Sequence, residues 1–384
     1  MRVGISCYPT VGGSGAVATE LGKALARRGH EVHFIVTDVP FRLGGFVEHV
    51  YIHQIEPITY PVLKTPPYDF ALASLMARVV DEYELDVLHA HYALPFAVCA
   101  HLAREMAHHP VRVVTTLHGT DITVLAQDQS LKSIIKLGIE QSDAVTAVSR
   151  SLIADTVRLF ETDKRIHCIY NFVDPDVFRP GCGGDLKRYF APNGERVLLH
   201  ISNFRPVKRI HDVIAVFAGV AKRMPAKLLL VGEGPDLGAA KRQVEQQGLS
   251  DRVHFLGRQD EVAPLFAAAD LFLLPSESES FGLVALEAMS CGVPVVGSTS
   301  GGIPEVVVHG ETGFLAPVGH IREMTGFACQ LLLDDALYAA FSERGRERAV
   351  REFHVHQKVS EYEALYREVM QAESGDPRHP GSRA

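Results

Sequence analysis

The sequence predicts an α/β protein of two similar domains, each a parallel sheet with helices on both faces. Short, almost continuously apolar runs alternate with segments of helical period along most of the chain, a pattern typical of parallel sheets that are buried on both faces. The chain has 384 residues, which is too long for one ordinary core. A stretch rich in Pro, Gly and Asp at residues 173–195 divides it, and we interpret this stretch as a linker.

The first predicted domain spans residues 1–172 and starts with a buried strand, a glycine-rich turn and a helix. Strands are expected at residues 2–7, 31–36, 86–89, 111–117, 144–147 and 166–169. Helices are expected at residues 16–28, 94–107, 131–141 and 152–160. This alternation of strand and helix defines one doubly wound sheet.

The second predicted domain spans residues 196–354 and repeats the same alternation. Strands are expected at residues 197–201, 227–231, 253–256, 271–274 and 293–297. Helices are expected from about residue 209 to 222, after residue 235, and at 281–289, 324–333 and 337–350. A last helix, beyond this domain, is expected at residues 355–370. The end of the chain, residues 372–384, lacks apolar content, so we expect it to be disordered.

Composition places the chain among globular proteins and argues against several partners. Hydrophobic residues make up 47% and charged residues 22%, as in soluble domains. The formal net charge of −8 implies no general attraction to nucleic acid. No apolar run approaches the roughly 20 residues of a membrane span. The N-terminus lacks the apolar core of a signal peptide, so a cytoplasmic protein without a membrane partner is expected.

The six cysteines are scattered and form no Cys-x-x-Cys pair. Free thiols in a reducing cytosol are therefore expected, and metal binding by these cysteines is not. No Asp-x-Asp is placed to bridge a diphosphate through a divalent ion. We expect no metal and no cofactor.

Ligands of open parallel sheets bind at the carboxyl ends of the strands, so polar residues that follow strands are candidates. His91 and Tyr92 follow one strand, residues 118–121 follow the next, and Asn171 follows the last strand of the first domain. Each histidine can equally have a structural hydrogen-bonding role. Asp121 can be read as a general base or as the N-cap of the helix that follows.

Two stretches have the chemistry of a phosphate site. Gly13, Ser14 and Gly15 lie between a strand and a helix, where glycines let backbone N–H groups approach an anion; an ordinary tight turn explains them as well. Arg205, Lys208 and Arg209 also follow a strand. Cations at a helix start oppose the helix dipole, so an anion between them makes this placement favourable.

Glu279 and Glu287 form the third candidate site. Glu279 lies in a predicted loop after a strand, and Glu287, eight residues later, lies just over one turn into the next predicted helix. Such a junction offers backbone N–H groups to an anion, and the two carboxylates can accept hydrogen bonds from hydroxyls. A ligand with both phosphate and sugar suits it. The alternative is a helix whose first turn is simply rich in Glu.

The full string narrows this choice. Glu279 and Glu287, with Ser-Phe-Gly between them and Gly-Gly-Ile-Pro-Glu following at residues 301–305, closely resemble the signature of retaining glycosyltransferases of the GT-B fold, family 4. The resemblance implies two Rossmann-like domains with an interdomain cleft and a last helix, residues 355–371, that crosses back to the first domain. The first domain would hold the acceptor and the second the UDP-sugar.

The resemblance also implies roles for individual residues. Catalytic roles fall to His118, beside the transferred sugar, to Arg205 and Lys208 at the leaving diphosphate, and to Glu279 at the donor sugar. Donor binding falls to Gly13, Ser14, Gly15, Gly232, Arg258, Phe281, Gly282, Leu283 and Glu287, the last on the ribose. The chain departs from the family pattern at Asn203, where an Arg is usual, and Arg205 can replace it or face the acceptor instead.

Five stretches are more similar to one group within this family, whose members move N-acetylglucosamine from UDP-GlcNAc to the hydroxyl of L-malate in bacillithiol biosynthesis. These stretches are residues 7–15, 66–69, 89–95, 116–125 and 202–205. Malate is a dianion, so its pocket needs cations and hydroxyls. The candidates are Lys64, Tyr92, Thr120, Asn171 and Arg205, with Ser14 near the joint between acceptor and donor. A homodimer is compatible with the sequence, which does not decide the oligomeric state.

Other functions remain open at this point. One is transfer to another small anionic acceptor, such as an inositol phosphate, or to a lipid. A UDP-GlcNAc 2-epimerase shares the two-domain architecture but has no need of the Glu279–Glu287 string. A regulator that binds a nucleotide sugar without turnover is the third alternative.

Overall fold

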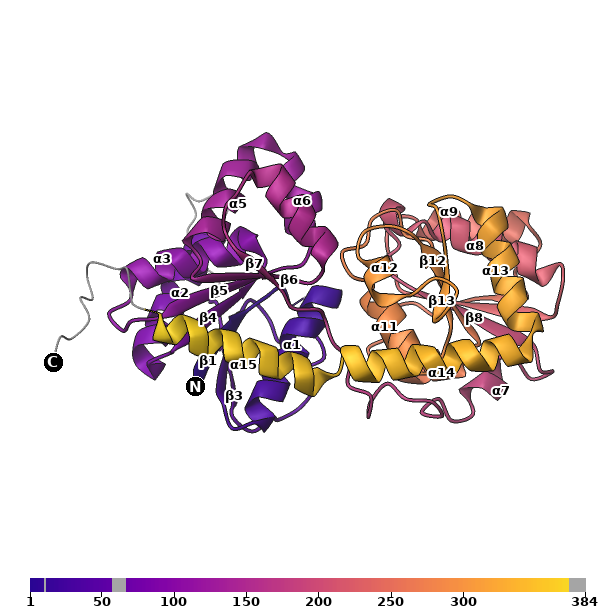
Figure 1. Ribbon diagram of the computed structural model, residues 1–384, viewed down its shortest axis with the longest axis horizontal. Helices are drawn as coiled ribbons and strands as arrows, with labels where there is room; N and C mark the ends of the chain where they lie inside the picture. The colour runs from indigo at the N-terminus through magenta and orange to yellow at the C-terminus, as the bar shows by residue number, and fades with distance from the viewer. Residues whose placement is uncertain (10–11, 57–66, 373–384) are drawn as a thin grey trace. The chain divides into compact units, whose positions relative to one another are not determined.

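The computed structural model describes residues 1–9, 12–56 and 67–372 (Figure 1). Lys64 and residues 373–384, on which two of the sequence-based expectations fall, lie outside the described residues. The chain divides into two compact units. The first unit contains Met1–Tyr170 and the chain from Val355 on, and the second unit contains Asn171–His354.

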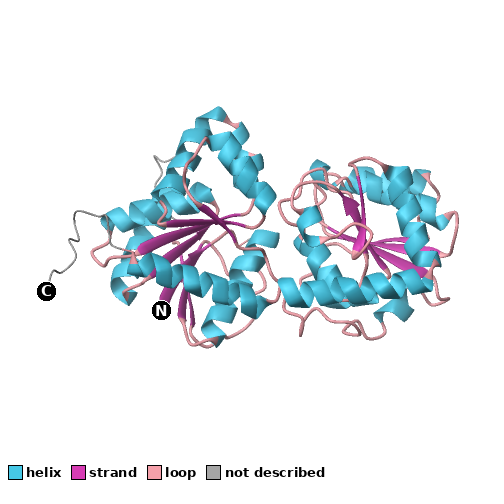
Figure 2. Ribbon diagram, in the orientation of Figure 1, coloured by secondary structure: helices cyan, strands magenta, loops and turns pink. Residues whose placement is uncertain are grey.

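The first unit is built on a parallel sheet of seven strands in the order β3-β2-β1-β4-β5-β6-β7. The strands are β1 Arg2–Ser6, β2 Glu31–Val36, β3 Val50–Gln54, β4 Val87–His91, β5 Arg112–Leu117, β6 Ala144–Ala147 and β7 Ile166–Cys168. The helices are α1 Gly13–Arg27, α2 Tyr68–Tyr83, α3 Val98–Met106, α4 Thr120–Thr123, α5 Gln129–Gln141, α6 Arg150–Phe160 and α15 Val355–Gln371. A π-helical turn η1 (Ala93–Ala97) and a 3₁₀ turn η2 (Leu125–Gln127) complete it. Figure 2 shows helices on both sides of the strands.

Helix α15 belongs to the first unit although it is the last helix of the chain. Its buried residues include Val355, Val359, Tyr362, Tyr366 and Val369, whose spacing of three and four places them on one face. The helix packs against α1 and β5. The hydroxyl of Tyr366 lies 2.7 Å from Nδ1 of a buried histidine in β4. The predicted return of the last helix to the first unit is confirmed.

The second unit contains a parallel sheet of six strands in the order β10-β9-β8-β11-β12-β13. The strands are β8 Arg196–Ile201, β9 Ala226–Val231, β10 Val253–Phe255, β11 Leu271–Leu274, β12 Val295–Ser298 and β13 Gly313–Ala316. The helices are α7 Leu186–Phe190, α8 Ile210–Ala221, α9 Leu237–Gln246, α10 Ala263–Ala268, α11 Leu283–Ser290, α12 Ile303–Val306, α13 Ile321–Leu333 and α14 Asp335–Glu352, with a 3₁₀ turn η3 at Pro206–Lys208.

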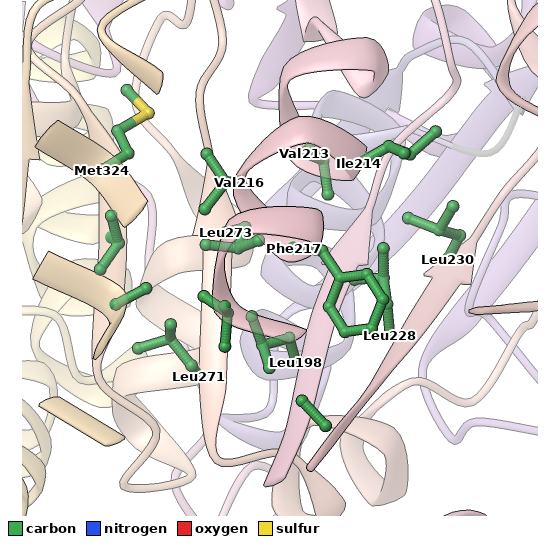
Figure 3. Close-up of a cluster of buried hydrophobic side chains, with 14 of the residues drawn as sticks. Leu198, Val213, Ile214, Val216, Phe217, Leu228, Leu230, Leu271, Leu273 and Met324 are labelled. Carbon is green, nitrogen blue, oxygen red and sulfur yellow. The ribbon is translucent and has the colours of Figure 1, made fainter. Parts of the chain in front are cut away.

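The core of the second unit explains why its strands read as continuous apolar runs. Phe217 of α8 is fully buried and packs in one cluster with Leu198, Leu228 and Leu271 from three strands and with Met324 of α13 (Figure 3). Burying a side chain of this size contributes about 1.5–3 kcal/mol. The predicted fold, two parallel α/β sheets, is confirmed.

The structure also differs from the predicted elements. It adds the strands β3 and β13, the helix α2 and the short helices α4, α7, α10 and α12, which the patterns did not lead us to expect. The helix expected at residues 94–107 starts at Val98, because Leu94 has an extended backbone within η1. A residue that precedes proline is disfavoured from helical geometry, and Pro95 follows Leu94.

Candidate active site

In the second unit, the loop after β11 crosses the loop after β12 at very short range. A Cβ on Gly301 would lie 2.0 Å from the carbonyl oxygen of Glu279, and a Cβ on Gly302 would lie 2.3 Å from that of Ser280. The N–H of Gly302 donates to the Glu279 carbonyl at 2.9 Å. Only glycine permits this approach, so the Gly-Gly pair fixes the backbone of Glu279.

Lys208 and Glu279 form an ion pair across two loops. Nζ of Lys208 lies 2.6 Å from Oε2 of Glu279, and the two side chains are 18% and 16% exposed. The N–H of Glu277 donates to the carbonyl of Val207 at 2.8 Å, which ties the same two loops together. The two predicted residues are therefore brought into direct contact.

The other two cations of this stretch differ in what they contact. Arg209 pairs with Asp212 and lies 3.8 Å from Glu277, so carboxylates already balance its charge. Arg205 is exposed, and no ion pair or hydrogen bond of its side chain is found among the described residues. Arg205 is thus the cation of this stretch whose side chain has no carboxylate partner among the described residues, whereas Lys208 is paired with Glu279.

Helix α11 starts immediately after the Glu279 loop. Gly282 precedes it with a φ of +94°, a conformation that favours glycine. The ring of Phe281 is 2% exposed and packs against Phe353 at 5.7 Å, so only the backbone of Phe281 is available to a ligand. The N–H of Ala285 already donates to the carbonyl of Gly282 at 2.9 Å, so the N–H groups of Leu283 and Val284 are the ones that helix geometry leaves for an anion. Glu287, on the next turn, is 2% exposed.

Gly232 and Arg258 follow the neighbouring strands β9 and β10. A Cβ on Gly232 would lie 1.8 Å from the carbonyl oxygen of Ser202, which follows β8. The N–H of Gly232 donates to the carbonyl of Gly257 at 2.8 Å. Arg258 is exposed and lies 3.4 Å from Asp260. The predicted donor residues of this unit thus gather at the carboxyl ends of four adjacent strands, β10, β9, β8 and β11.

In the first unit, Gly13, Ser14 and Gly15 are the first residues of α1. The first N–H of the helix to bond within it is that of Ala16, which donates to the carbonyl of Gly12 at 3.1 Å. The preceding N–H groups are the ones that helix geometry leaves unpaired. The hydroxyl of Tyr92 donates to Oγ of Ser14 at 2.8 Å, so two predicted residues from the ends of β1 and β4 are in contact.

His118 lies at the end of β5, 8% exposed, and its Nε2 is 2.9 Å from Nδ1 of His91. Burial lowers the pKa of His118 to about 3 and lowers that of His91 well below its usual value. Both imidazoles are therefore neutral at pH 7. His91 follows His89 by two residues in a strand, which places both side chains on one face of the sheet; this spacing could have identified the contact between the rings of His89 and His91, whose centroids are 4.3 Å apart, but not the contact of His91 with His118.

Asp121 joins the loops that follow β4 and β5. Its carboxylate oxygens accept from the N–H of Ala93 and from the N–H of Gly119, both at 3.0 Å. Burial raises its pKa to about 6. The side chain does not cap helix α4, so the N-cap alternative is wrong. Thr120 is half-buried and is the first residue of α4.

Asn171 is the first residue of the second unit. It is 6% exposed, and its Oδ1 is buried without a hydrogen-bond partner in the described parts of the chain. A buried amide oxygen usually has a partner, so this atom has an unused acceptor site.

Within residues 1–9, 12–56 and 67–372, no group of three or more His, Cys, Asp and Glu side chains is arranged to hold a metal ion. In the same ranges, no helix combines the length and the apolar character needed to cross a bilayer.

Comparison with known proteins places this geometry in a family. Residues 11–177 match the family described as Glycosyltransferase Family 4, and residues 185–348 match Glycosyl transferases group 1. Among solved structures, sucrose-phosphate synthase from Thermosynechococcus elongatus has a TM-score of 0.79 at 24% identity and covers 96% of this chain and 98% of its own. The Anabaena protein HepE in complex with UDP and glucose has a TM-score of 0.80 at 23% identity and covers 95% and 99%.

Two curated relatives are similar in sequence. D-inositol 3-phosphate glycosyltransferase of Mycolicibacterium smegmatis is 30% identical over 88% of this chain and 82% of its own length. N-acetyl-alpha-D-glucosaminyl L-malate synthase of Bacillus anthracis is 51% identical over 371 residues, which cover 96% of this chain and 97% of that protein. The chain therefore belongs to glycosyltransferase family 4, together with this malate synthase.

Proposed function

We propose that the protein is a retaining glycosyltransferase that moves N-acetylglucosamine from UDP-GlcNAc to the hydroxyl of L-malate. The observation that carries this proposal is the 51% identity, over nearly the full length of both chains, to a protein named for that synthesis. The reaction would take place in the cytoplasm. The six cysteines, all free in the structure, are compatible with a reducing compartment.

The second unit would bind the donor. The N–H groups at the start of α11 would donate hydrogen bonds to phosphate oxygens, and Glu287 would accept hydrogen bonds from the ribose hydroxyls. Glu279, held by its backbone contact to Gly302, would orient the sugar. Gly232 and the backbone next to Arg258 would lie against the uracil.

The first unit would bind malate. Tyr92 and Ser14, already hydrogen-bonded to each other at 2.8 Å, offer hydroxyls, and Thr120 offers another. Lys64 would supply a cation for the carboxylates. Arg205 and Asn171, which belong to the second unit, would add a cation and an amide. Gly13, Ser14 and Gly15 would add backbone N–H groups at the diphosphate, and His118 would contact the transferred sugar.

Charge on the leaving diphosphate explains why cations are needed. As the bond between the anomeric carbon and the β-phosphate oxygen breaks, negative charge develops on that phosphate. Lys208 and Arg205 would stabilise it, each by about 2–4 kcal/mol if they act like oxyanion-hole donors. The malate hydroxyl oxygen would bond to the same face of the sugar, and its proton would pass to the departing phosphate, so configuration is retained.

The proposal is tested by incubating the purified protein with UDP-GlcNAc, with and without L-malate. UDP release that depends on malate, together with an α-linked GlcNAc-malate product in the NMR spectrum, is the expected result. Formation of ManNAc without malate would identify an epimerase, and binding without UDP release would identify a regulator. Either result would overturn the proposal.

A second candidate acceptor is an inositol phosphate, because relatives at 30% and 32% identity are named D-inositol 3-phosphate glycosyltransferase. Both acceptors are small anions. Competition between L-malate and D-inositol 3-phosphate at equal concentration, with both products quantified, distinguishes them. We expect the malate product to dominate.

A further inference from the structure

His91 and His118 form a direct hydrogen bond between two neutral imidazoles. Their Nδ1 and Nε2 atoms lie 2.9 Å apart. The ring planes differ by 22° and the ring centroids are 5.1 Å apart, which fits a hydrogen bond along the edges of nearly coplanar rings. A neutral imidazole has one N–H donor and one bare acceptor nitrogen. One ring of this pair must therefore donate and the other must accept.

The surroundings of His91 decide which ring donates. His91 is fully buried, and its Nε2 has no hydrogen-bond partner among the described residues. The adjacent His89, whose ring centroid is 4.3 Å away, has both ring nitrogens paired with the hydroxyls of Tyr366 and Thr116. If His91 accepted at Nδ1, its proton would be on Nε2 and would be a buried donor without an acceptor, an arrangement that folded proteins rarely tolerate.

We propose that His91 is a positioning residue: its Nδ1–H donates to Nε2 of His118 and so holds His118 as the tautomer with its proton on Nδ1. No hydrogen bond to that nitrogen is found among the described residues. His118 is then a hydrogen-bond donor for an oxygen of the substrate, and it is neither a cation nor a base. The substrate part of this inference rests on the function proposed above, whereas the tautomer does not.

A second histidine pair in the same unit provides a matched control. Nδ1 of His33 lies 2.9 Å from Nε2 of His53, and Nε2 of His33 lies 3.0 Å from a carboxylate oxygen of Glu31. Here the carboxylate, which can only accept, sets the tautomer of His33. The pair connects β2 and β3, and neither histidine is among the proposed site residues.

The tautomer is read directly from ¹⁵N NMR spectra of the full chain labelled at histidine. We expect a protonated Nδ1 and a bare Nε2 on His118, with through-hydrogen-bond coupling from Nδ1–H of His91 to that bare Nε2. The His118→Gln variant assigns the signals. A proton on Nε2 of His118 would overturn the proposal whether or not the protein turns over UDP-GlcNAc.

Kinetics test the effect on the reaction. His91→Leu removes the donor, and we expect kcat to fall about tenfold or more, as for one lost hydrogen bond, with the KM for UDP-GlcNAc nearly unchanged. The side-chain amide of His91→Asn can donate from nearly the same place and should restore most of kcat. His53→Leu breaks the control pair and should leave kcat unchanged. Full activity in His91→Leu, or loss in His91→Asn equal to that in His91→Leu, would contradict the proposal.

These results are distinguishable from failure of the proposed function. If the unaltered chain releases no UDP with malate, the function fails and the NMR result alone decides the positioning role. If the His91→Leu chain does not fold, His91→Asn and the spectrum of the unaltered chain still decide it.

Discussion

At the scale of single residues, the proposed donor site depends on opposite charges held close together. Lys208 and Glu279 are each less than one fifth exposed and 2.6 Å apart. Partial burial reduces screening by water and strengthens the interaction of Lys208 with any anion that enters. Lys208 can therefore contribute more than an exposed lysine.

Replacing this lysine tests its role. Lys208→Met should lower kcat about 30- to 1,000-fold, the equivalent of about 2–4 kcal/mol of lost transition-state stabilisation. Initial rates of UDP release at saturating substrates measure it. Lys222→Met makes the same change at an exposed position of the same unit and should leave the rate unchanged. Equal rates in the two variants would exclude Lys208 from the chemistry.

Glu287 gives the second prediction at this scale. Its side chain is 2% exposed, so its oxygens act in a site with little water. Glu287→Ala should weaken UDP binding by about 1–3 kcal/mol because hydrogen bonds to the ribose are lost, which calorimetry can measure. The exposed Glu277→Ala is the control. The ribose assignment is wrong if Glu287→Ala lowers the affinity for 2′,3′-dideoxy-UDP, which lacks the ribose hydroxyls, by as much as it lowers the affinity for UDP.

At the scale of elements, two glycines show how helices α8 and α13 pack. A Cβ on Gly219 of α8 would lie 2.5 Å from Cγ2 of Thr325 of α13. Thr325 is held by a hydrogen bond from its hydroxyl to the carbonyl of Ile321 at 2.7 Å, and β-branched side chains are stiff. Gly326, the next residue of α13, has no heavy atom within 4 Å of an added Cβ.

The two positions should therefore respond oppositely to alanine. Gly219→Ala should destabilise the second unit by about 1–3 kcal/mol, because the helices must move apart. Gly326→Ala should stabilise it by about 0.5–1 kcal/mol, because alanine is the better helix former. Urea denaturation of both variants measures this. Changes of the same sign would mean that α8 and α13 do not pack as described.

Elements with a strong pattern could be predicted from the sequence, and those without one could not. The buried run of β11 and the junction that leads into α11 were both recognisable, because strand and helix periods follow one another directly there. β3 lies at the edge of its sheet and has exposed Tyr51 and Ile52, so its residues alternate weakly. α2 carries a helical period in Leu72, Met76 and Val79 and could have been predicted from it.

In the candidate site, too, local sequence patterns predict some features and not others. Motif spacing identified Glu279 and Glu287, but not that Phe281 uses its ring for packing, since burial depends on residues such as Phe353 that are distant in sequence. The contacts of Lys208 with Glu279 and of Tyr92 with Ser14 likewise join different strand ends. The order of the strands in the sheet brings these residues together, and no local sequence pattern encodes that order.

At the scale of the whole molecule, buried histidines make folding sensitive to acid. Burial lowers the pKa of eight histidines, and these are unevenly shared between the units. In the first unit they are His33, His53, His89, His91, His118 and His167, and in the second they are His200 and His254.

A lowered pKa means that the unfolded chain binds protons first as the pH falls. Burying these histidines in the neutral form contributes fully to the free energy of unfolding above about pH 6.5. Below that pH the contribution decreases by up to about 1.4 kcal/mol per pH unit for each histidine. The raised pKa of Asp121 opposes this between about pH 6 and 4, with one proton against several. We expect the first unit to unfold first at pH 5, as detected by proteolysis with mass spectrometry of the fragments. First cleavage in the second unit would contradict this expectation.

Helix α15 has a consequence for how the protein is made. The second unit is continuous in sequence, from Asn171 to His354, whereas the first unit needs a helix that is translated last. Domains usually fold as they leave the ribosome, the N-terminal one first. Here the sheet of the first unit emerges before Tyr366, one of the two hydroxyl partners of His89, and the unit is completed only after residues 355–371 have been translated. We therefore expect the nascent chain to need chaperones until residues 355–371 have emerged.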